Sequence, residues 1–201
     1  MSGPGAVIKV GGSLFGWGPL PARLAAYLDG RRANRLVLVA GGGGAADFVR
    51  ALDAAHALGE ERSHALALRA MDLTADALVA LLPETLRSAE AAADLATIWD
   101  AGRVPVLSPR PMLDEDDARG DPDRLDHAWS VTADAIAARV AVRLGVGELV
   151  LLKSSPAPEG ANRVELARLG LVDPAFNVAS RTLRMVRYLD FRRESGPGRR
   201  I

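Results

Sequence analysis

The chain has 201 residues, 25 basic (Lys, Arg) and 25 acidic ones, and no cysteine. The balanced charge gives no electrostatic reason to expect a nucleic acid or an anionic membrane as partner, and the lack of thiols excludes disulfides and thiolate metal sites. No apolar run reaches the roughly 18 residues of a membrane span, and the amino terminus, Met1-Ser2-Gly3-Pro4-Gly5, lacks the features of a signal peptide. We therefore expect a cytoplasmic protein with one substantial core and a single domain, residues 1–201.

Apolar runs and helical patterns alternate along the chain, which indicates an α/β fold with a largely parallel sheet. Expected strands are 6–10, 35–40, 104–107, 149–152 and about 183–189. Expected helices are 20–28, a segment from the glycines to Gly59, 63–82, 88–101, one starting near Asp134 and ending at Gly145, and a short one at 164–169. In the helix 63–82 the expected buried face is Leu66, Ala70, Leu73, Ala77, Leu78 and Leu81. We expect an irregular acidic loop at 114–126 and a frayed tail after residue 191.

Four consecutive glycines, Gly41, Gly42, Gly43 and Gly44, join the second strand to the next helix. Residues without Cβ can adopt positive φ and bring backbone N–H groups close to a ligand. An anion, and most plausibly a phosphate, is the expected guest.

Lysine is rare in this chain: Lys9 and Lys153 are the two lysines among 25 basic residues. Lysine supplies a compact ammonium where arginine supplies a planar fork. Lys9 interrupts an apolar strand, where it would be costly unless its ammonium met an anion. Chance in an arginine-rich composition is the alternative explanation.

Two familiar phosphate loops fit poorly. A Walker A loop has a lysine after its glycines, whereas Lys9 precedes Gly11-Gly12 and no lysine follows Gly44. The series Gly41-x-Gly43-x-x-Ala46 satisfies a relaxed dinucleotide fingerprint with Glu60-Glu61 downstream, but it follows the second strand and its acidic pair lies between two helices.

Four segments, taken in order and spacing, resemble the amino acid kinase superfamily. They are Lys9-Val10-Gly11-Gly12-Ser13, Ala40 to Gly44, Val131 to Ala138 and Leu151-Leu152-Lys153-Ser154. Within this group, Asp126 to Asp134 is similar to the small kinases that phosphorylate aminomethyl-furanmethanol phosphate in methanofuran biosynthesis. The resemblance implies a three-layer αβα sandwich, with an acceptor- and phosphate-binding part at about 7–110 and a shortened nucleotide-binding part at about 127–190.

The resemblance also implies in-line phosphoryl transfer from ATP to a small acceptor, with Mg²⁺ carried by the nucleotide, no dedicated metal site, and a homo-oligomeric assembly. Lys9 and Lys153 would neutralise the transferred phosphoryl group and Asp134 would position both ammonium groups. Gly11, Gly12, Ser13, Thr132 and the four glycines 41–44 would bind phosphate or substrate. For Asp134, a carboxylate favouring its own helix dipole is the alternative.

His127 and Trp129 could line the acceptor pocket, or belong to a loop that packs one aromatic ring on the core. His56 and His64 are expected at the surface or between helices. The acidic run Asp114-Glu115-Asp116-Asp117 is expected in a solvated loop, with attraction of a substrate amine as the alternative. Arg192, Arg193, Arg199 and Arg200 are expected in the solvated tail.

One departure weakens the expectation of ATP binding. Where many relatives continue with a threonine- or aspartate-rich turn and a longer nucleotide segment, this chain continues with Ser155-Pro156-Ala157-Pro158 and ends soon after. A non-catalytic anion- or nucleotide-binding sensor or storage subunit of the same fold is therefore the alternative function, and a dinucleotide-dependent enzyme is a third.

Overall fold

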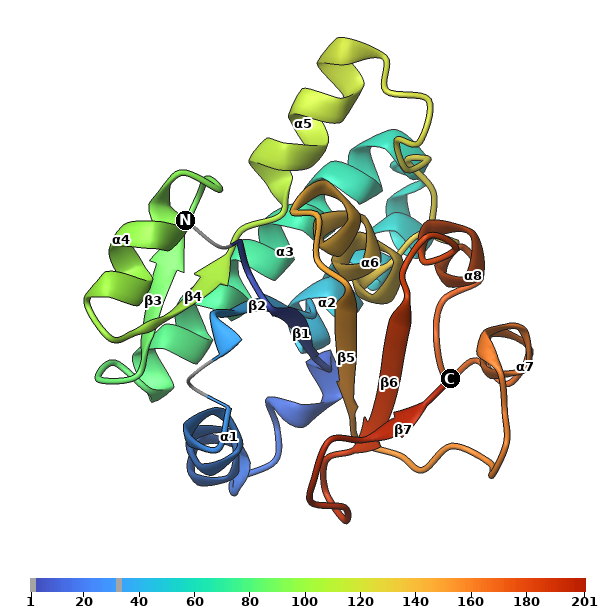
Figure 1. The fold of residues 1–201 in the computed structure, drawn as a ribbon. Helices are drawn as coiled ribbons and strands as arrows, with labels where there is room; N and C mark the ends of the chain where they lie inside the picture. The colour runs from blue at the N-terminus through green and yellow to red at the C-terminus, as the bar shows by residue number, and fades with distance from the viewer. Residues whose placement is uncertain (1–2, 32–33) are drawn as a thin grey trace.

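A seven-stranded sheet runs through the middle of the protein in the order β3-β4-β2-β1-β5-β6-β7 (Figure 1). This computed structural model describes residues 3–31 and 34–201. Met1 and Ser2, which belong to the amino terminus that was predicted not to be a signal peptide, lie outside the described residues. The strands are β1 (Ala6–Val10), β2 (Leu36–Ala40), β3 (Leu86–Ala89), β4 (Val104–Leu107), β5 (Glu148–Lys153), β6 (Met185–Asp190) and β7 (Arg199–Arg200). The described pairings are parallel apart from β6 with β7. The prediction of a largely parallel α/β fold is confirmed.

Helices cover both faces of the sheet, which gives the predicted three layers (Figure 1). They are η1 (Gly12–Leu14), α1 (Leu20–Asp29), α2 (Gly43–His56), α3 (Glu60–Leu81), α4 (Asp94–Asp100), α5 (Arg110–Arg119), α6 (Ala133–Arg143), α7 (Arg163–Arg168) and α8 (Phe176–Ala179). None of the helices in the described part of the chain combines the length and the apolar composition that a bilayer span requires.

The core has one part on each face, and strand alternation decides which residues enter which part. Val7 and Leu149 pack with α6, while Ile8 and Val150 pack on the opposite face with α1. Lys9 lies two residues after Val7 and therefore points to the α6 face. Lys153 stands in the same relation to Leu149 and Leu151 on the neighbouring strand, so both lysines are directed to the same helix.

The predicted helix 88–101 is wrong at its first half. Residues Leu86–Ala89 instead form β3, which adds to the sheet by pairing with β4, and the helix begins at Asp94. The Asp94 carboxylate accepts the N–H groups of Glu90 and Ala91 and so holds a turn before α4. The alanine-rich composition favours a helix locally, but pairing with β4 overrides it.

The predicted acidic loop is also wrong over most of its length, because Arg110–Arg119 is helix α5. Pro109 and Pro111 stand at its start, where proline is tolerated, and Gly120 ends it with φ of 60°. Its carboxylates pair with arginines of the same helix and of α6 and with His127.

Two further expectations need correction. On α3 the prediction is confirmed for Ala70 and Leu78, which are buried, but it is wrong for Leu66, Leu73, Ala77 and Leu81, which are exposed. Leu68, Met71 and Ala75 are buried in their place, so the buried face of the helix is rotated relative to the predicted one. In the tail, Arg199–Arg200 pairs with β6 as an antiparallel strand, and Arg192 donates from Nη2 to the carbonyl oxygen of Ser13 at 3.1 Å.

Candidate active site

The carboxyl ends of β1, β2 and β5 meet at a cavity of about 490 Å³. β1 is central, with β2 on one side and β5 on the other, so the sheet order reverses here and ligands are expected at this edge. The cavity wall contains every predicted site residue except His127. These are Lys9, Gly11, Gly12, Ser13, Gly41, Gly42, Gly43, Gly44, Trp129, Thr132, Asp134 and Lys153.

Asp134 lies between the two lysines in the first turn of α6. Lys9 Nζ is 2.9 Å from Asp134 Oδ1, and Lys153 Nζ is 2.8 Å from Asp134 Oδ2. All three side chains are almost fully enclosed. Two ammonium groups and one carboxylate leave a net positive charge in a buried place, and that charge suits an anionic guest.

The pKa values of this trio follow from burial and from its two cations. Burial pushes the pKa of Asp134 upward, but Lys9 and Lys153 outweigh burial and lower the pKa to about 2. Asp134 is therefore ionised at neutral pH and is a poor proton acceptor. Burial, with the nearby charge of Lys9, lowers the pKa of Lys153 despite the attraction of Asp134.

The two glycine turns pack backbone against backbone. A Cβ built on Gly12 would stand 2.4 Å from the nitrogen of Gly43, and one on Gly43, whose φ is +51°, would stand 2.8 Å from the oxygen of Gly12. A Cβ on Gly41 would lie 3.2 Å from Lys9 Cε, so the lysine stem passes directly over this glycine. A Cβ on Gly44 would meet nothing within 4 Å.

The backbone donors of the cavity are not all available to a ligand. Gly11 donates its N–H to Leu152 O at 2.8 Å, and Gly41 donates its N–H to Val10 O at 2.9 Å. Gly43 and Gly44 begin α2, and the first N–H groups of a helix have no partner inside it. The α2 start, rather than Gly11 or Gly41, is therefore the part of the glycine turns suited to phosphate oxygens.

Asp173, which the sequence analysis did not select, caps α6 from a distant loop. Its Oδ2 accepts the N–H groups of Thr132 at 3.2 Å and Ala135 at 2.9 Å and the hydroxyl of Thr132 at 2.9 Å. The α6 cap is thus supplied from a distant segment, because Thr132 is the N-cap residue but its own side chain makes no capping bond. Burial, together with the charge of Asp134, raises the pKa of Asp173 to about 6 against these hydrogen bonds.

Trp129 lies in the cavity wall, where Asp53 and Arg50 contact its indole ring. Its Nε1 donates to Asp53 Oδ2 at 2.7 Å, and the Arg50 guanidinium lies 5.2 Å from the ring centroid. Arg50 also lines the cavity and pairs with Asp47 at 2.7 Å. This places a cation and an aromatic ring at the same wall of the cavity.

His127 is not in the cavity wall, contrary to expectation. Its two ring nitrogens each lie 2.8 Å from a carboxylate, Glu61 on α3 and Asp117 on α5. Burial lowers the pKa of His127, but these carboxylates outweigh burial and raise it. His64, expected outside the site, is the histidine that lines the cavity, and it stacks on His127 with the centroids 4.6 Å apart. Burial, with the charge of His127, lowers the pKa of His64.

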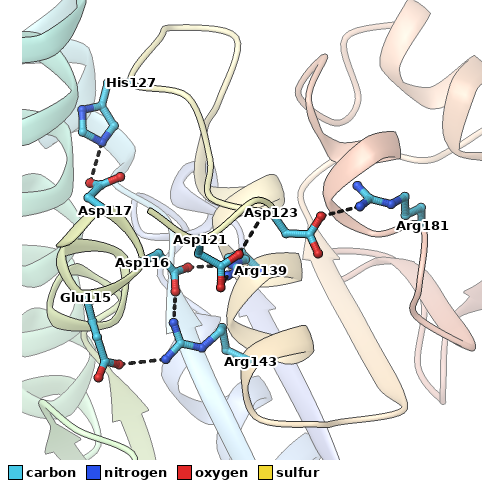
Figure 2. Close-up of polar contacts among 9 residues, drawn as sticks. All are labelled: Glu115, Asp116, Asp117, Asp121, Asp123, His127, Arg139, Arg143 and Arg181. Carbon is cyan, nitrogen blue, oxygen red and sulfur yellow. Dashed lines mark hydrogen bonds and ion pairs between the residues drawn. The ribbon is translucent and has the colours of Figure 1, made fainter. Parts of the chain in front are cut away.

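The acidic run neither forms a solvated loop nor lines the cavity. Figure 2 shows Glu115 and Asp116 directed at arginines of α6 and Asp117 directed at His127, while Asp114 is exposed and pairs with Arg110 of α5 itself. Asp116 lies 2.6 Å from Arg139 Nε and also pairs with Arg143, and Glu115 lies 2.7 Å from Arg143 Nη2. The run therefore binds α5 to α6, the helix that carries Asp134.

Comparisons with known proteins identify a family and related folds. The sequence model described as "Amino acid kinase family" matches residues 5–157. A [5-(aminomethyl)furan-3-yl]methyl phosphate kinase from Methanocaldococcus jannaschii is 26% identical over 146 residues, which cover 72% of this chain and 63% of that protein. The chain thus spans less than two thirds of the length of this relative.

Solved structures share the fold. A UMP kinase from Ureaplasma parvum superimposes with a TM-score of 0.64 at 12% identity, covering 94% of this chain and 90% of that one. A uridylate kinase from Archaeoglobus fulgidus gives 0.62 at 16% identity, covering 92% and 90%. A UMP kinase from Bacillus anthracis gives 0.61 at 11% identity, covering 96% and 89%.

Proposed function

Because the chain belongs to the amino acid kinase family, we propose that it transfers the γ-phosphoryl group of ATP to an oxygen of a small acceptor. One observation carries this proposal: Asp134 holds Lys9 and Lys153 together in the wall of a cavity that also contains the start of α2. Such a set of donors suits a phosphoryl group in transit better than a static carboxylate or a neutral ligand.

In the proposed reaction an acceptor oxygen forms a bond to the γ-phosphorus while the bond from that phosphorus to the oxygen shared with the β-phosphate breaks. Charge spreads over the three remaining oxygens, and the two ammonium groups offset it. Asp134 keeps those groups in place and does not take the proton, because its pKa is about 2. A phosphomonoester acceptor, with a second pKa of about 6, is already largely ionised at neutral pH and needs no base.

The residues of the cavity fit a nucleoside triphosphate, since two lysines and the amino-terminal end of α2 converge there. In the described ranges 3–31 and 34–201 no group of three His, Cys, Asp or Glu side chains is arranged to hold a metal ion. We propose that Mg²⁺ binds with the nucleotide phosphates, where it would neutralise part of their charge.

We further propose a phosphomonoester that carries an amine and a flat ring as the acceptor, specifically the aminomethyl-furan phosphate named for the relative. Arg50 would bind the phosphate, and the nearby Trp129 would contact the ring. Asp173 and Asp47 are the cavity carboxylates that an amine could approach. The product would be a diphosphate.

The test is phosphoryl transfer by the purified protein with ATP, Mg²⁺ and this acceptor, followed by phosphorus NMR. Lys9→Ala and Lys153→Ala should each lower kcat by about 100-fold or more, because each removes a charge that acts on the transition state. Arg87→Ala, which removes an exposed cation from β3, is the matched control and should leave kcat unchanged.

If correctly folded Lys9→Ala and Lys153→Ala proteins turn over as fast as the parent, the proposed mechanism is wrong. Circular dichroism and the melting temperature of each variant establish the folding. Tight nucleotide binding with no transfer to any acceptor would instead favour the non-catalytic sensor or storage subunit.

A further inference from the structure

A second cavity, of about 500 Å³, lies between α1 and the segment that follows β6. Arg23, Tyr27 and Arg31 form one wall, and Phe191 and Pro197 lie opposite. None of its lining residues lines the catalytic cavity. In Figure 1 both bounding segments, α1 and the turn before β7, lie in the lower part of the view.

Two aromatic rings and two guanidinium groups line this cavity. The rings of Tyr27 and Phe191 meet edge to face with centroids 5.6 Å apart. The Arg23 guanidinium lies 5.5 Å from the Phe191 ring centroid, and that of Arg31 lies 5.4 Å from the Tyr27 ring centroid. An aromatic or similarly flat guest would find both apolar and guanidinium faces to pack against.

Three buried donors of this wall have no hydrogen-bond partner among the residues that the structure describes. They are Nε of Arg23, Nε of Arg31 and the hydroxyl of Tyr27. Burial raises the pKa of Tyr27, so its hydroxyl remains a donor at neutral pH. Because buried donors are normally satisfied, rotation of these side chains toward the adjoining cavity would let a bound acceptor satisfy them.

The charges around the cavity favour an anion. Arg31 pairs with Glu148 at 3.0 Å, and Glu194, the acidic residue of the lining, pairs with Arg199 at 2.6 Å. Arg23 donates to the backbone oxygen of Glu194 but makes no ion pair with any carboxylate in the described ranges. Its positive charge is therefore available to a ligand.

We propose that this cavity is a second ligand site, for a small carboxylate that carries a flat ring. The carboxylate accepts hydrogen bonds from Arg23 and Tyr27, and the ring packs against Phe191. The inference does not depend on the proposed kinase reaction, because it rests on residues outside the catalytic cavity.

Hydrogen bonds also connect this second cavity to the carboxyl end of β5 and to the turn after β1, which border the catalytic cavity. The N–H of Phe191 donates to Lys153 O at 2.7 Å, and Arg192, the next residue, donates to Ser13 O at 3.1 Å. A ligand that moves Phe191 would thus act directly on the backbone that carries Lys153.

The test is isothermal titration of the full chain with benzoate, benzyl alcohol and benzylammonium as probes. Benzoate should bind about tenfold more tightly than benzyl alcohol, and benzylammonium should not bind, because the site is cationic. Arg23→Gln should weaken benzoate binding by about tenfold, while Arg87→Gln on β3 should not change it. Ala26→Leu, at an exposed position of the same wall, should weaken binding without removing a charge.

Chemical shifts of backbone amides locate the probe. Shifts at Tyr27 and Phe191 that disappear in Arg23→Gln support the proposal. Equal binding of benzoate and benzylammonium, or unchanged benzoate affinity in both folded Arg23→Gln and Ala26→Leu, would overturn it. Benzoate shifts confined to Lys9 and Gly43 would overturn it as well, since they would place the probe in the catalytic cavity.

Discussion

Gly12 and Gly44 lie in the same cavity wall but in opposite steric situations. A Cβ on Gly12 would meet the Gly43 nitrogen and Cα at 2.4 and 2.6 Å, so two backbone turns would have to separate. A Cβ on Gly44 would enter open space within the first turn of α2. Absence of a side chain is thus required at the first position and only tolerated at the second.

We expect Gly12→Ala to lower the free energy of unfolding by about 1–3 kcal/mol through overpacking, and to lower the proposed kinase activity with it. Gly44→Ala should raise the free energy of unfolding by up to about 1 kcal/mol, because alanine is the better helix former. Urea unfolding of both variants measures the difference. Equal destabilisation by the two substitutions would contradict the backbone contact between the turns.

Composition made Lys9 and Lys153 identifiable from the sequence, whereas Asp134 was selected through the resemblance of Val131 to Ala138 to the amino acid kinase superfamily. Two lysines among many arginines, one of them inside an apolar strand, are conspicuous without any knowledge of contacts. Asp173 gave no such signal: it stands in an ordinary Asp-Pro turn, and its contacts with Thr132 and Ala135 cross about 40 residues of chain. His64 was expected at the surface or between helices and not in the cavity wall, because the predicted buried face of α3 did not include it.

At the scale of elements, α5 is held to α6 by charge rather than by an apolar stripe. Asp116 is 1% exposed and lies between Arg139 and Arg143 (Figure 2). On the same helix, Asp114 is 64% exposed and pairs with Arg110 at 3.8 Å. The two aspartates, two positions apart, therefore provide a matched pair of buried and exposed ion pairs.

Asp116→Asn should lower the free energy of unfolding by about 2–3 kcal/mol, since it removes the buried carboxylate that Arg139 and Arg143 share. Arg139 then keeps only Asp121 as its ion-pair partner, and Arg143 keeps only Glu115, among the described residues. Asp114→Asn should cost less than about 1 kcal/mol, because water screens an exposed pair. Chemical denaturation at low and high salt distinguishes them, and only the small Asp114 effect should shrink further with salt. Similar losses for both variants would count against the buried pairing.

The same helix shows why part of the fold was not predictable. The segment Asp114 to Asp117 has the composition of a solvated loop. The α6 arginines that pair with its Glu115 and Asp116 lie more than 20 residues later in the chain. The strand Leu86–Ala89 was missed for a similar reason, since its pairing with β4 is not encoded locally. By contrast, β1, β2 and β5 were identified because each is a continuous apolar run of the kind that central parallel strands require.

At the scale of the whole molecule, two buried carboxylates of one cavity, Asp134 and Asp173, have opposite effects on how the free energy of unfolding depends on pH. Asp134, with a pKa of about 2, contributes stability that is present above pH 3.8 and is lost as pH falls through 2. Asp173, with a pKa of about 6, contributes stability that is present below pH 3.8 and is lost as pH rises through 6. The first effect belongs to strongly acidic solutions and the second to the range between pH 4 and 7.

Asp173→Asn isolates the second effect, because asparagine retains an oxygen for the α6 cap and cannot ionise. The variant and the parent should be similarly stable at pH 4, where Asp173 is largely protonated in the folded chain. At pH 7.5 the variant should be more stable than the parent by up to about 3 kcal/mol, which corresponds to a pKa shift of about two units. Urea unfolding across this range measures the difference, and Asp100→Asn at the exposed end of α4 controls for loss of a surface charge. If Asp173→Asn is less stable than the parent by the same amount at both pH values, its role is that of an ordinary ionised cap and the burial of its charge has no effect on the stability of the molecule.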